Sequence, residues 1–390
     1  MTTSSIFRII DPINMNKGDV RRNAFMLKGP LAKKGYDWWW HNFTGYDRST
    51  GEAKSFFIEY FVCNPALGSK EPILGQLERN RAAGVRPSYA LVKVGYWGKG
   101  ARQIHNFYGI DDFRFQPGKL DLSIGDCVLT EREMRGSCSL TKAESSLHPE
   151  YMCDWGTMSW DLKIDKRIAF NVGYGASPLV RSLNAFEMFW HAEGIKTEFS
   201  GEVVLDGRAY DVVPERSYGY SDKNWGADFT SPWLWISSCN MTSLVSGKKL
   251  LNSAVEIGGG NPKVYGLSLG RKLLGCMCYE GRMHEFNFSK FWTGSRVAFK
   301  FDEGAVTNVW EVEAENRNAR MELRLECPKD EMLLVNYEAP NGKKSHNRLW
   351  NGGTGRGEIK LLSRRKGQWE LIDRISMENT GCEYGEYGER

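Results

Sequence analysis

Hydrophobic and polar residues alternate along most of this chain, which is the pattern of β-strands with one buried face. The most β-prone runs are residues 55–62 (SFFIEYFV) and 89–97 (YALVKVGYW), and turn residues follow each of them. Gly125-Asp126 separates two short runs and predicts a hairpin. Further strands are expected within residues 159–164, 201–210, 310–315, 321–327, 358–362 and 369–373.

Helical periodicity is rare. Residues 178–190 begin with a proline and carry apolar residues at helical intervals, so they predict a helix, whereas residues 71–81 fit a helix or a loop. The glycine runs Gly258–Gly260 and Gly352–Gly357 favour mobile turns over nucleotide cradles. Many short strands with few helices predict an all-β protein of β-barrels or sandwiches. Its 390 residues suit two such domains, which we place at residues 1–190 and 191–390.

Composition excludes several classes of protein. The chain has 14 Trp, 16 Tyr and 19 Phe but only 6 His, and its net charge of +4 comes without a basic block. We therefore expect no nucleic-acid partner. No apolar run is long enough to span a membrane, and the first residues do not resemble a secretory signal, so we expect a cytoplasmic protein with nine reduced cysteines. The Cys276, Cys278 and His284 spacing does not suit zinc, and no metal or cofactor is predicted.

Two segments combine aromatic and polar residues in a way that an ordinary core strand does not. Residues 35–41 (GYDWWWH) place three adjacent tryptophans in one predicted strand, so their rings must point to both faces. Residues 214–228 (PERSYGYSDKNWGAD) precede a strand containing Trp233 and Trp235. Each segment fits an aromatic ligand cavity with a few polar groups, or a barrel strand and a structural corner.

The second segment resembles the tocopherol cyclase family. Residues 217–226 (SYGYSDKNWG), followed by residues 233–236 (WLWI), are similar to its Ser-Glu-Lys-Asn-Trp-Gly signature. Residues 36–39, 55–65 and 312–318 resemble three further elements of the family in the same order. Two acidic positions of the family are shortened to aspartate here, at Asp37 and Asp222. Since no plastid transit peptide is recognised, the chain resembles a bacterial member whose substrate is not the tocopherol precursor.

The resemblance implies two lipocalin-like (calycin-type) β-barrel or sandwich domains with few short helices and an apolar cavity. Its wider relatives include carotenoid hydratases and fungal cyclases of the Diels–Alder type. Plant members protonate a prenyl double bond beside a phenol, which needs a buried, protonated acid and aromatic walls that stabilise a carbocation. The acid candidates are Asp37 and Asp222, with Lys223 and Asn224 to orient the substrate and Tyr218 or Tyr220 to relay a proton. The expected cavity residues are Trp38, Trp39, Trp40, His41, Glu59, Glu187, His191, Trp225, Trp233 and Trp235.

Two hypotheses about function remain open from the sequence. The first is a cofactor-independent isomerase, cyclase or hydratase acting on an alkene or enone in an apolar phenolic or prenylated molecule. The second is a non-catalytic carrier that holds a hydrophobic molecule in the same cavity. A sugar-binding or glycosidase sandwich ranks last, because the family motif does not support it. Edge strands are compatible with a homodimer.

Overall fold

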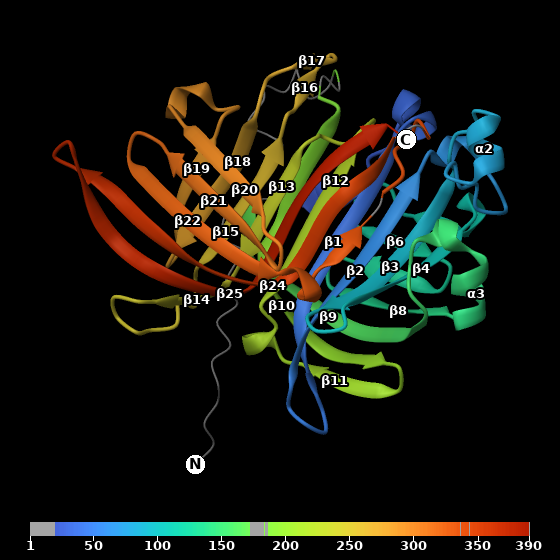
Figure 1. Ribbon diagram of the computed structural model, residues 1–390, viewed down its shortest axis with the longest axis horizontal. Helices are drawn as coiled ribbons and strands as arrows, with labels where there is room; N and C mark the ends of the chain where they lie inside the picture. The colour runs from blue at the N-terminus through green and yellow to red at the C-terminus, as the bar shows by residue number, and fades with distance from the viewer. Residues whose placement is uncertain (1–19, 172–182, 184–185, 336, 343, 390) are drawn as a thin grey trace.

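The computed structural model describes residues 20–171, 183, 186–335, 337–342 and 344–389. Within them, two large antiparallel sheets lie side by side, which confirms the predicted all-β fold (Figure 1). Short helices α2 (Glu78–Ala82) and α3 (Lys142–Leu147) lie beside the first sheet. No helix in these described ranges has both the length and the apolar character needed to cross a membrane.

The first sheet is built from the N-terminal half of the chain and has twelve strands, in the order β4-β3-β2-β1-β11-β10-β9-β8-β7-β6-β5, with β12 paired to β1 and β10. It curves until β4 and β8 meet, where the Asn106 amide donates to the Ser139 carbonyl and accepts from the Ser139 N–H. The strands are β1 (Tyr36–Asp47), β2 (Ala53–Cys63), β3 (Tyr89–Trp97), β4 (Arg102–Tyr108), β5 (Phe113–Phe115), β6 (Asp121–Ile124), β7 (Cys127–Thr130), β8 (Glu133–Leu140), β9 (Gly156–Phe170), β10 (Met188–Leu205), β11 (Arg208–Val212) and β12 (Gly219–Gly226).

The second sheet has eleven strands, in the order β19-β18-β15-β13-β25-β24-β22-β21-β20, with β14 on β25 and β23 on β24. It also curves, and the Asn316 side chain donates to the Glu285 carbonyl across the gap between its two ends. The strands are β13 (Trp233–Ser238), β14 (Asn240–Ser243), β15 (Ala254–Gly260), β18 (Lys272–Tyr279), β19 (Arg282–Asn287), β20 (Arg296–Glu303), β21 (Thr307–Glu315), β22 (Ala319–Pro328), β23 (Leu333–Val335), β24 (Lys344–Arg365) and β25 (Gln368–Glu389). A separate hairpin is formed by β16 (Lys263–Val264) and β17 (Leu267–Ser268).

The chain changes from one sheet to the other between Gly226 and Trp233, whereas residues 190 and 191 lie inside β10. The predicted domain boundary at residues 190 and 191 rested on a helix expected at residues 178–190. Most of its residues lie outside the described ranges, and its end, from Met188 to Trp190, is the start of β10. These residues pair with β12, so strand pairing outweighs the local helical spacing of apolar side chains.

Three buried clusters follow from the alternation of side chains along the strands. On β1, Trp39 and Phe43 point into the core of the first sheet, whereas Tyr36 and Trp40 belong to a cluster shared by both sheets. On β13, Leu234 and Ile236 point into the core of the second sheet, and Trp233 and Trp235 join the shared cluster. We call this shared cluster the inter-sheet layer; its aromatic residues include Tyr36, Trp40, Phe57, Phe61, Tyr89, Trp97, Trp190, Tyr220, Phe229, Trp233, Trp235 and Tyr337.

The two glycine runs that were expected to form mobile turns lie within strands instead. Gly258–Gly260 end β15, and Gly352–Gly357 lie in β24, where the pairing with β25 shifts register. A Cβ atom on Gly258 would lie 2.4 Å from the ring of Trp190, and one on Gly353 would lie 2.0 Å from the ring of Trp97. Glycine is therefore required here because an indole from the opposite sheet packs directly on the backbone.

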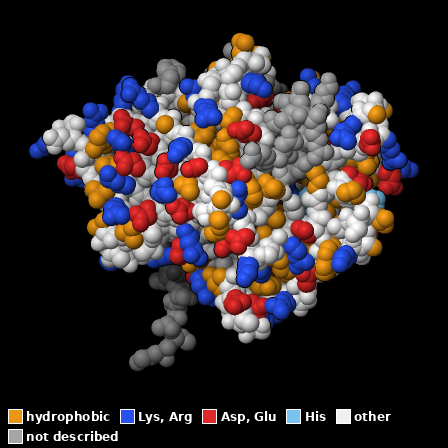
Figure 2. All heavy atoms as spheres, viewed as in Figure 1, with side chains coloured by type: hydrophobic (Ala, Val, Ile, Leu, Met, Phe, Trp, Pro, Cys, Tyr) orange, Lys and Arg blue, Asp and Glu red, His pale blue; other side chains and the backbone are white. Residues whose placement is uncertain are grey.

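All nine cysteines are free, and every one except Cys153 is buried. On the outer surface, acidic and basic side chains are interspersed, as Figure 2 shows for the face in view. Several of them form cross-strand ion pairs, such as Arg324 with Glu311.

We predict that Gly353→Ala lowers the free energy of unfolding by about 1–3 kcal/mol, because the added methyl group must displace the Trp97 ring or the strand. Urea denaturation would measure the loss. In a Trp97→Leu background the same substitution should cost much less, because the ring that obstructs the methyl group is gone. Equal costs in the two backgrounds would contradict the proposed contact.

Candidate functional site in the inter-sheet layer

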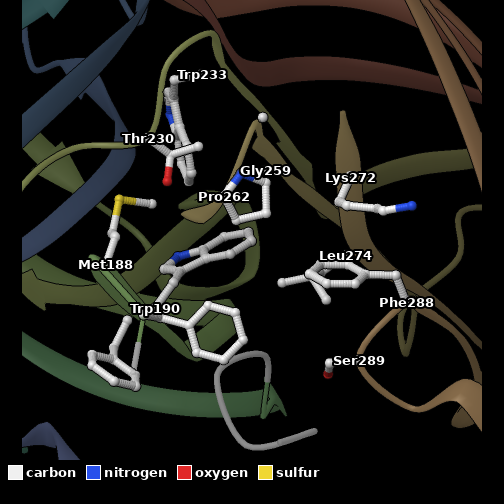
Figure 3. Close-up of a pocket in the computed structure, with 13 residues that line it drawn as sticks. Met188, Trp190, Thr230, Trp233, Gly259, Pro262, Lys272, Leu274, Phe288 and Ser289 are labelled. Carbon is white, nitrogen blue, oxygen red and sulfur yellow. The ribbon is translucent and has the colours of Figure 1, made fainter. Parts of the chain in front are cut away.

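A pocket with mainly apolar walls opens at one edge of the inter-sheet layer (Figure 3). Its cavity volume is about 70 Å³. In Figure 3 the Trp190 indole lies among the lining side chains below Pro262, whereas the Lys272 ammonium points away from them. The pocket is lined by Phe186, Met188, Phe189, Trp190, Thr230, Trp233, Gly259, Gly260, Pro262, Lys272, Leu274, Phe288 and Ser289.

Two tryptophans of this pocket also hold buried carboxyl groups. Trp190 Nε1 donates a hydrogen bond to Asp222 Oδ2 at 2.7 Å, and Trp233 Nε1 donates to Glu383 Oε2 at 2.8 Å. The two indoles pack edge to face, with ring centroids 5.8 Å apart. Each indole therefore lines the pocket with one edge, while its N–H donates a hydrogen bond to an acid that does not line the pocket.

Tyr220 joins Asp222, a residue of the first sheet, to Glu256, a residue of the second. Its hydroxyl lies 3.0 Å from Asp222 Oδ2 and 2.9 Å from Glu256 Oε1, and Trp235 Nε1 also donates to Glu256 Oε1 at 2.9 Å. A tyrosine hydroxyl carries one proton, so it can donate to only one of the two carboxyls. The other carboxyl must carry a proton of its own to complete the second hydrogen bond.

Burial favours the protonated forms of these acids. It raises the pKa of Asp222 to about 8, although the hydrogen bonds from Trp190 and Tyr220 act in the opposite direction. It also raises the pKa of Glu383 to about 7 and the pKa of Glu256 well above its usual value. Asp222 is thus mainly protonated at neutral pH, and its Oδ1 has no hydrogen-bond partner among the described residues.

A second group of polar residues continues the layer away from the pocket. The buried Lys93 pairs with Glu59 at 2.5 Å, and its Nζ lies 3.8 Å from the centre of the Tyr337 ring. Tyr337 donates to Glu59 Oε2 at 2.9 Å. Asn351 connects this side to the pocket side, because it accepts from Trp97 Nε1 and donates to Glu383. Glu59, which the sequence predicted to line the cavity, is therefore part of a buried ion pair.

Asp37, the other predicted acid, and Lys223, predicted to orient the substrate, lie on the opposite face of β1 and β12. They form an ion pair in which both side chains are fully buried, and Asp37 Oδ2 also accepts from the Met26 N–H at 2.7 Å. Lys223 Nζ lies 4.0 Å from the centre of the Trp39 ring and 5.4 Å from that of Trp225. Burial raises the pKa of Asp37 to about 6, although Lys223 counteracts this shift, and burial lowers the pKa of Lys223.

The other predicted residues lie on the face that carries Asp37, in the inter-sheet layer, or near the edges of these strands and of the pocket. His41, hydrogen-bonded to Ser221 at 2.9 Å, shares the face of Asp37, and alternation along β10 places His191 there too. Asn224 and Trp38 lie in or against the inter-sheet layer, where Tyr36 donates to Asn224 at 2.8 Å. Tyr218 precedes β12 and is half-buried, with Lys249 5.2 Å from its ring. Glu187 lies beside the pocket, where it accepts from Thr230 at 3.3 Å.

Sequence reasoning did not identify Trp190, Glu256, Glu383 or Lys93. Trp190 was assigned to the predicted helix. Glu256 and Lys93 are the single charged residues of strands that are otherwise apolar, small or aromatic, Ala254–Gly260 and Tyr89–Trp97, whereas Glu383 is one of several charged residues in β25. A charge at a core position of a strand is the signal that could have revealed them, because such a charge requires a buried partner.

Cys276 and Cys278 share the inter-sheet face of β18, whereas His284 pairs with Met277 and lies on the other face. Across the described residues, no His, Cys, Asp and Glu side chains gather in a group of three or more that could hold a metal ion.

Comparisons with known proteins place this chain near one family. The sequence pattern of the tocopherol cyclase-like family matches residues 141–386. The probable chloroplastic tocopherol cyclase of Oryza sativa subsp. japonica is 34% identical over 146 residues, covering 35% of this chain and 27% of that protein. The chloroplastic tocopherol cyclase of Zea mays is 32% identical over 142 residues, covering 35% of this chain and 26% of that protein. The chain thus spans about a quarter of the length of these curated relatives.

Among solved structures, kievitone hydratase from Nectria haematococca aligns with 94% of this chain and 95% of its own, with a TM-score of 0.44 and 11% sequence identity.

We predict that Asp37→Asn lowers the free energy of unfolding by about 3–5 kcal/mol, because it leaves Lys223 charged and unpaired in the core. Chemical denaturation at neutral pH would measure this loss. The double variant Asp37→Asn/Lys223→Met should be more stable than Asp37→Asn alone, since it removes the isolated charge. A single variant as stable as wild type would contradict a structural role for the pair.

The raised pKa of Asp222 predicts how stability depends on pH. Between about pH 4 and pH 8 the unfolded chain has lost this proton and the folded chain retains it, so the Asp222 contribution to stability falls as pH rises. The free energy of unfolding of Asp222→Asn should therefore rise relative to wild type across this range, by up to about 1.4 kcal/mol per pH unit. Urea denaturation at several pH values would measure it, with Asp161→Asn, a variant of an exposed carboxyl, as the control. A difference that does not depend on pH would show that Asp222 ionises equally in both states.

Proposed function

Because the chain belongs to the tocopherol cyclase-like family, we propose that it is a cofactor-independent acid–base enzyme. Its reaction is the isomerisation, cyclisation or hydration of an alkene or enone in an apolar phenolic or prenylated molecule. One observation carries this proposal: Asp222 is a buried acid, its pKa is raised to about 8, and it is hydrogen-bonded to the tryptophan that lines an apolar pocket. The names of the curated relatives, which are tocopherol cyclases, support the reaction class.

The proposed reaction starts with a protonated acid. Asp222 transfers its proton to one alkene carbon, the π electrons form the new C–H bond, and a cation remains on the other carbon. The faces of Trp190 and Trp233 stabilise that cation, and the apolar walls exclude bulk water. A phenol oxygen of the substrate, or one admitted water molecule, then forms the C–O bond and returns its proton to the Asp222 carboxylate. Alternatively, the Asp222 carboxylate takes a proton from a neighbouring C–H group, whose electrons form the new double bond of an isomer.

The substrate must reach Asp222 past Trp190. The indole contacts both the pocket and the acid, and Asp222 is not among the residues that line the pocket. The pocket is also smaller than typical ligand sites, whose volumes are roughly 300–1,000 Å³. We infer that the Trp190 side chain turns when the substrate binds, which enlarges the pocket and exposes the unpartnered Asp222 Oδ1.

The position of Trp190 between the pocket and Asp222 favours the carrier hypothesis as the second candidate. If Trp190 stays in place, the pocket holds an apolar molecule that never meets the acid. The two functions differ in their products. Mass spectrometry of candidate phenolic and prenylated compounds after incubation distinguishes them: an unchanged mass with altered retention indicates cyclisation or isomerisation, a gain of one water indicates hydration, and an unchanged compound indicates a carrier.

We predict that Asp222→Asn lowers kcat at least about 100-fold, because the amide cannot supply the proton. Binding of the substrate, followed by quenching of tryptophan fluorescence, should change little, since the amide keeps the shape of the carboxyl. The measurement is product formation by the purified variant on whichever compound the wild-type chain converts.

Glu193→Gln provides a matched control. Glu193 is also fully buried, burial raises its pKa to about 7, and it shares the face of Asp37 rather than that of the pocket. Its partner Lys166 keeps a second carboxylate, Glu131, at 2.7 Å, so the control should fold. Turnover near the wild-type rate in Asp222→Asn, or an equal loss in both variants, would rule out Asp222 as the proton donor.

A further inference from the structure

The hairpin β16–β17 stands at the edge of the pocket and has an unusual turn. Its two central residues, Tyr265 and Gly266, have φ angles of 48° and 81°. Two positive φ angles are typical of a type I′ hairpin turn, which favours asparagine or glycine at both positions. A bulky tyrosine rarely adopts this backbone conformation. The backbone at Tyr265 is therefore strained, and the turn places an aromatic ring at the tip of the hairpin.

The tip exposes apolar side chains that no core contact requires. Tyr265 is 67% exposed, Leu267 75% and Leu269 40%, so three large apolar residues within five positions face solvent. Figure 2 shows apolar side chains standing out at the top of the molecule, at the position of β17 in Figure 1. Isolated exposed apolar residues are common, but such a group marks an interaction site.

The charged residues of the hairpin segment itself are all basic, and one acidic residue outside the segment faces them. Residues 261–272 contain Lys263, Arg271 and Lys272 and no acidic residue. The facing acid is Glu187, whose carboxylate lies 3.6 Å from Lys263 Nζ. Arg271 lies over the Phe299 ring at 5.3 Å, and the Lys272 ammonium points away from the pocket. Apolar residues bordered by cations complement an anionic lipid surface, and aromatic side chains favour the interface between lipid and water.

The hairpin is also connected to the pocket. Pro262 and Lys272, at the two ends of the hairpin segment, line the pocket, and Phe186 lines it while forming a backbone bridge to Val264. The tip itself has only a few residues, which is small beside the roughly 800 Å² that each partner buries in a stable protein interface. Its size therefore favours a lipid surface over a protein partner.

We propose that the hairpin β16–β17 docks this chain on an anionic lipid surface by inserting Tyr265, Leu267 and Leu269 between the headgroups. Docking in this way holds the rim of the pocket at the surface, where an apolar molecule dissolved in the lipid can enter without crossing water. The docking rests on the hairpin alone, and only the delivery of a substrate rests on the proposed function.

The test is co-sedimentation of the full chain with vesicles of phosphatidylcholine alone and of an equimolar mixture with phosphatidylserine. We expect binding to the mixed vesicles that weakens as salt is added, because salt screens the attraction between the basic side chains and the anionic headgroups. The double variant Tyr265→Ser/Leu267→Ser should lower the partition coefficient at least about tenfold, as expected for losing the burial of two apolar side chains. Thermal denaturation checks that the variants remain folded.

Leu147→Ser in α3 is the matched control. Leu147 is 74% exposed, but it is far from the hairpin in the sequence and lies beside the first sheet. It should partition like the wild-type chain. Failure of the wild-type chain to bind mixed vesicles, or equal partitioning of the hairpin variant and the control, would overturn the proposal. No substrate is present in this assay, and Asp222→Asn should partition like wild type, so failure of docking and failure of the proposed function are distinguishable.

Discussion

The packing of tryptophan rings onto glycine backbone determines how closely the two sheets approach each other. Trp97 of the first sheet lies over Gly353 of the second, and Trp190 of the first sheet lies over Gly258 of the second. A flat ring against bare backbone fills space without a void, and protein interiors have little tolerance for voids or overlap. The inter-sheet layer, and with it the pocket at its edge, depends on this fit.

The same indoles determine the chemistry of the layer, because their N–H groups must find acceptors when they are buried. Trp190, Trp233 and Trp235 each donate to a carboxyl group. A neutral donor satisfies a carboxyl oxygen without supplying a full opposite charge, so burial dominates and the carboxyls favour their protonated forms. Where a cation is present instead, as for Asp37 with Lys223, the pair has the arrangement of a structural ion pair.

Much of the fold could be predicted from the sequence because β-strands have a period of two, and this period is visible in runs such as Trp310–Glu315. The site could be predicted only in part. The aromatic segments 35–41 and 214–228 contain Asp222, Tyr220 and Trp40, but which face each residue occupies depends on the pairing of β1 with β12, and register is a property of two strands together. Glu256 and Glu383 were missed because their partners lie on strands far away in the sequence. Most of the helix expected at residues 178–190 lies outside the described residues, and at its end, from Met188 to Trp190, pairing between distant strands outweighs the local pattern.

The matching of rings to glycines also limits how the pocket can change over evolution. A smaller side chain in place of Trp190 would enlarge the pocket, but it would leave empty space above Gly258 that the protein must fill or lose stability. A larger residue at Gly258 is accepted only if the ring shrinks at the same time. Pocket size is thus encoded by residue pairs on opposite sheets, so chains that diverge to accept different molecules must change both members of a pair together.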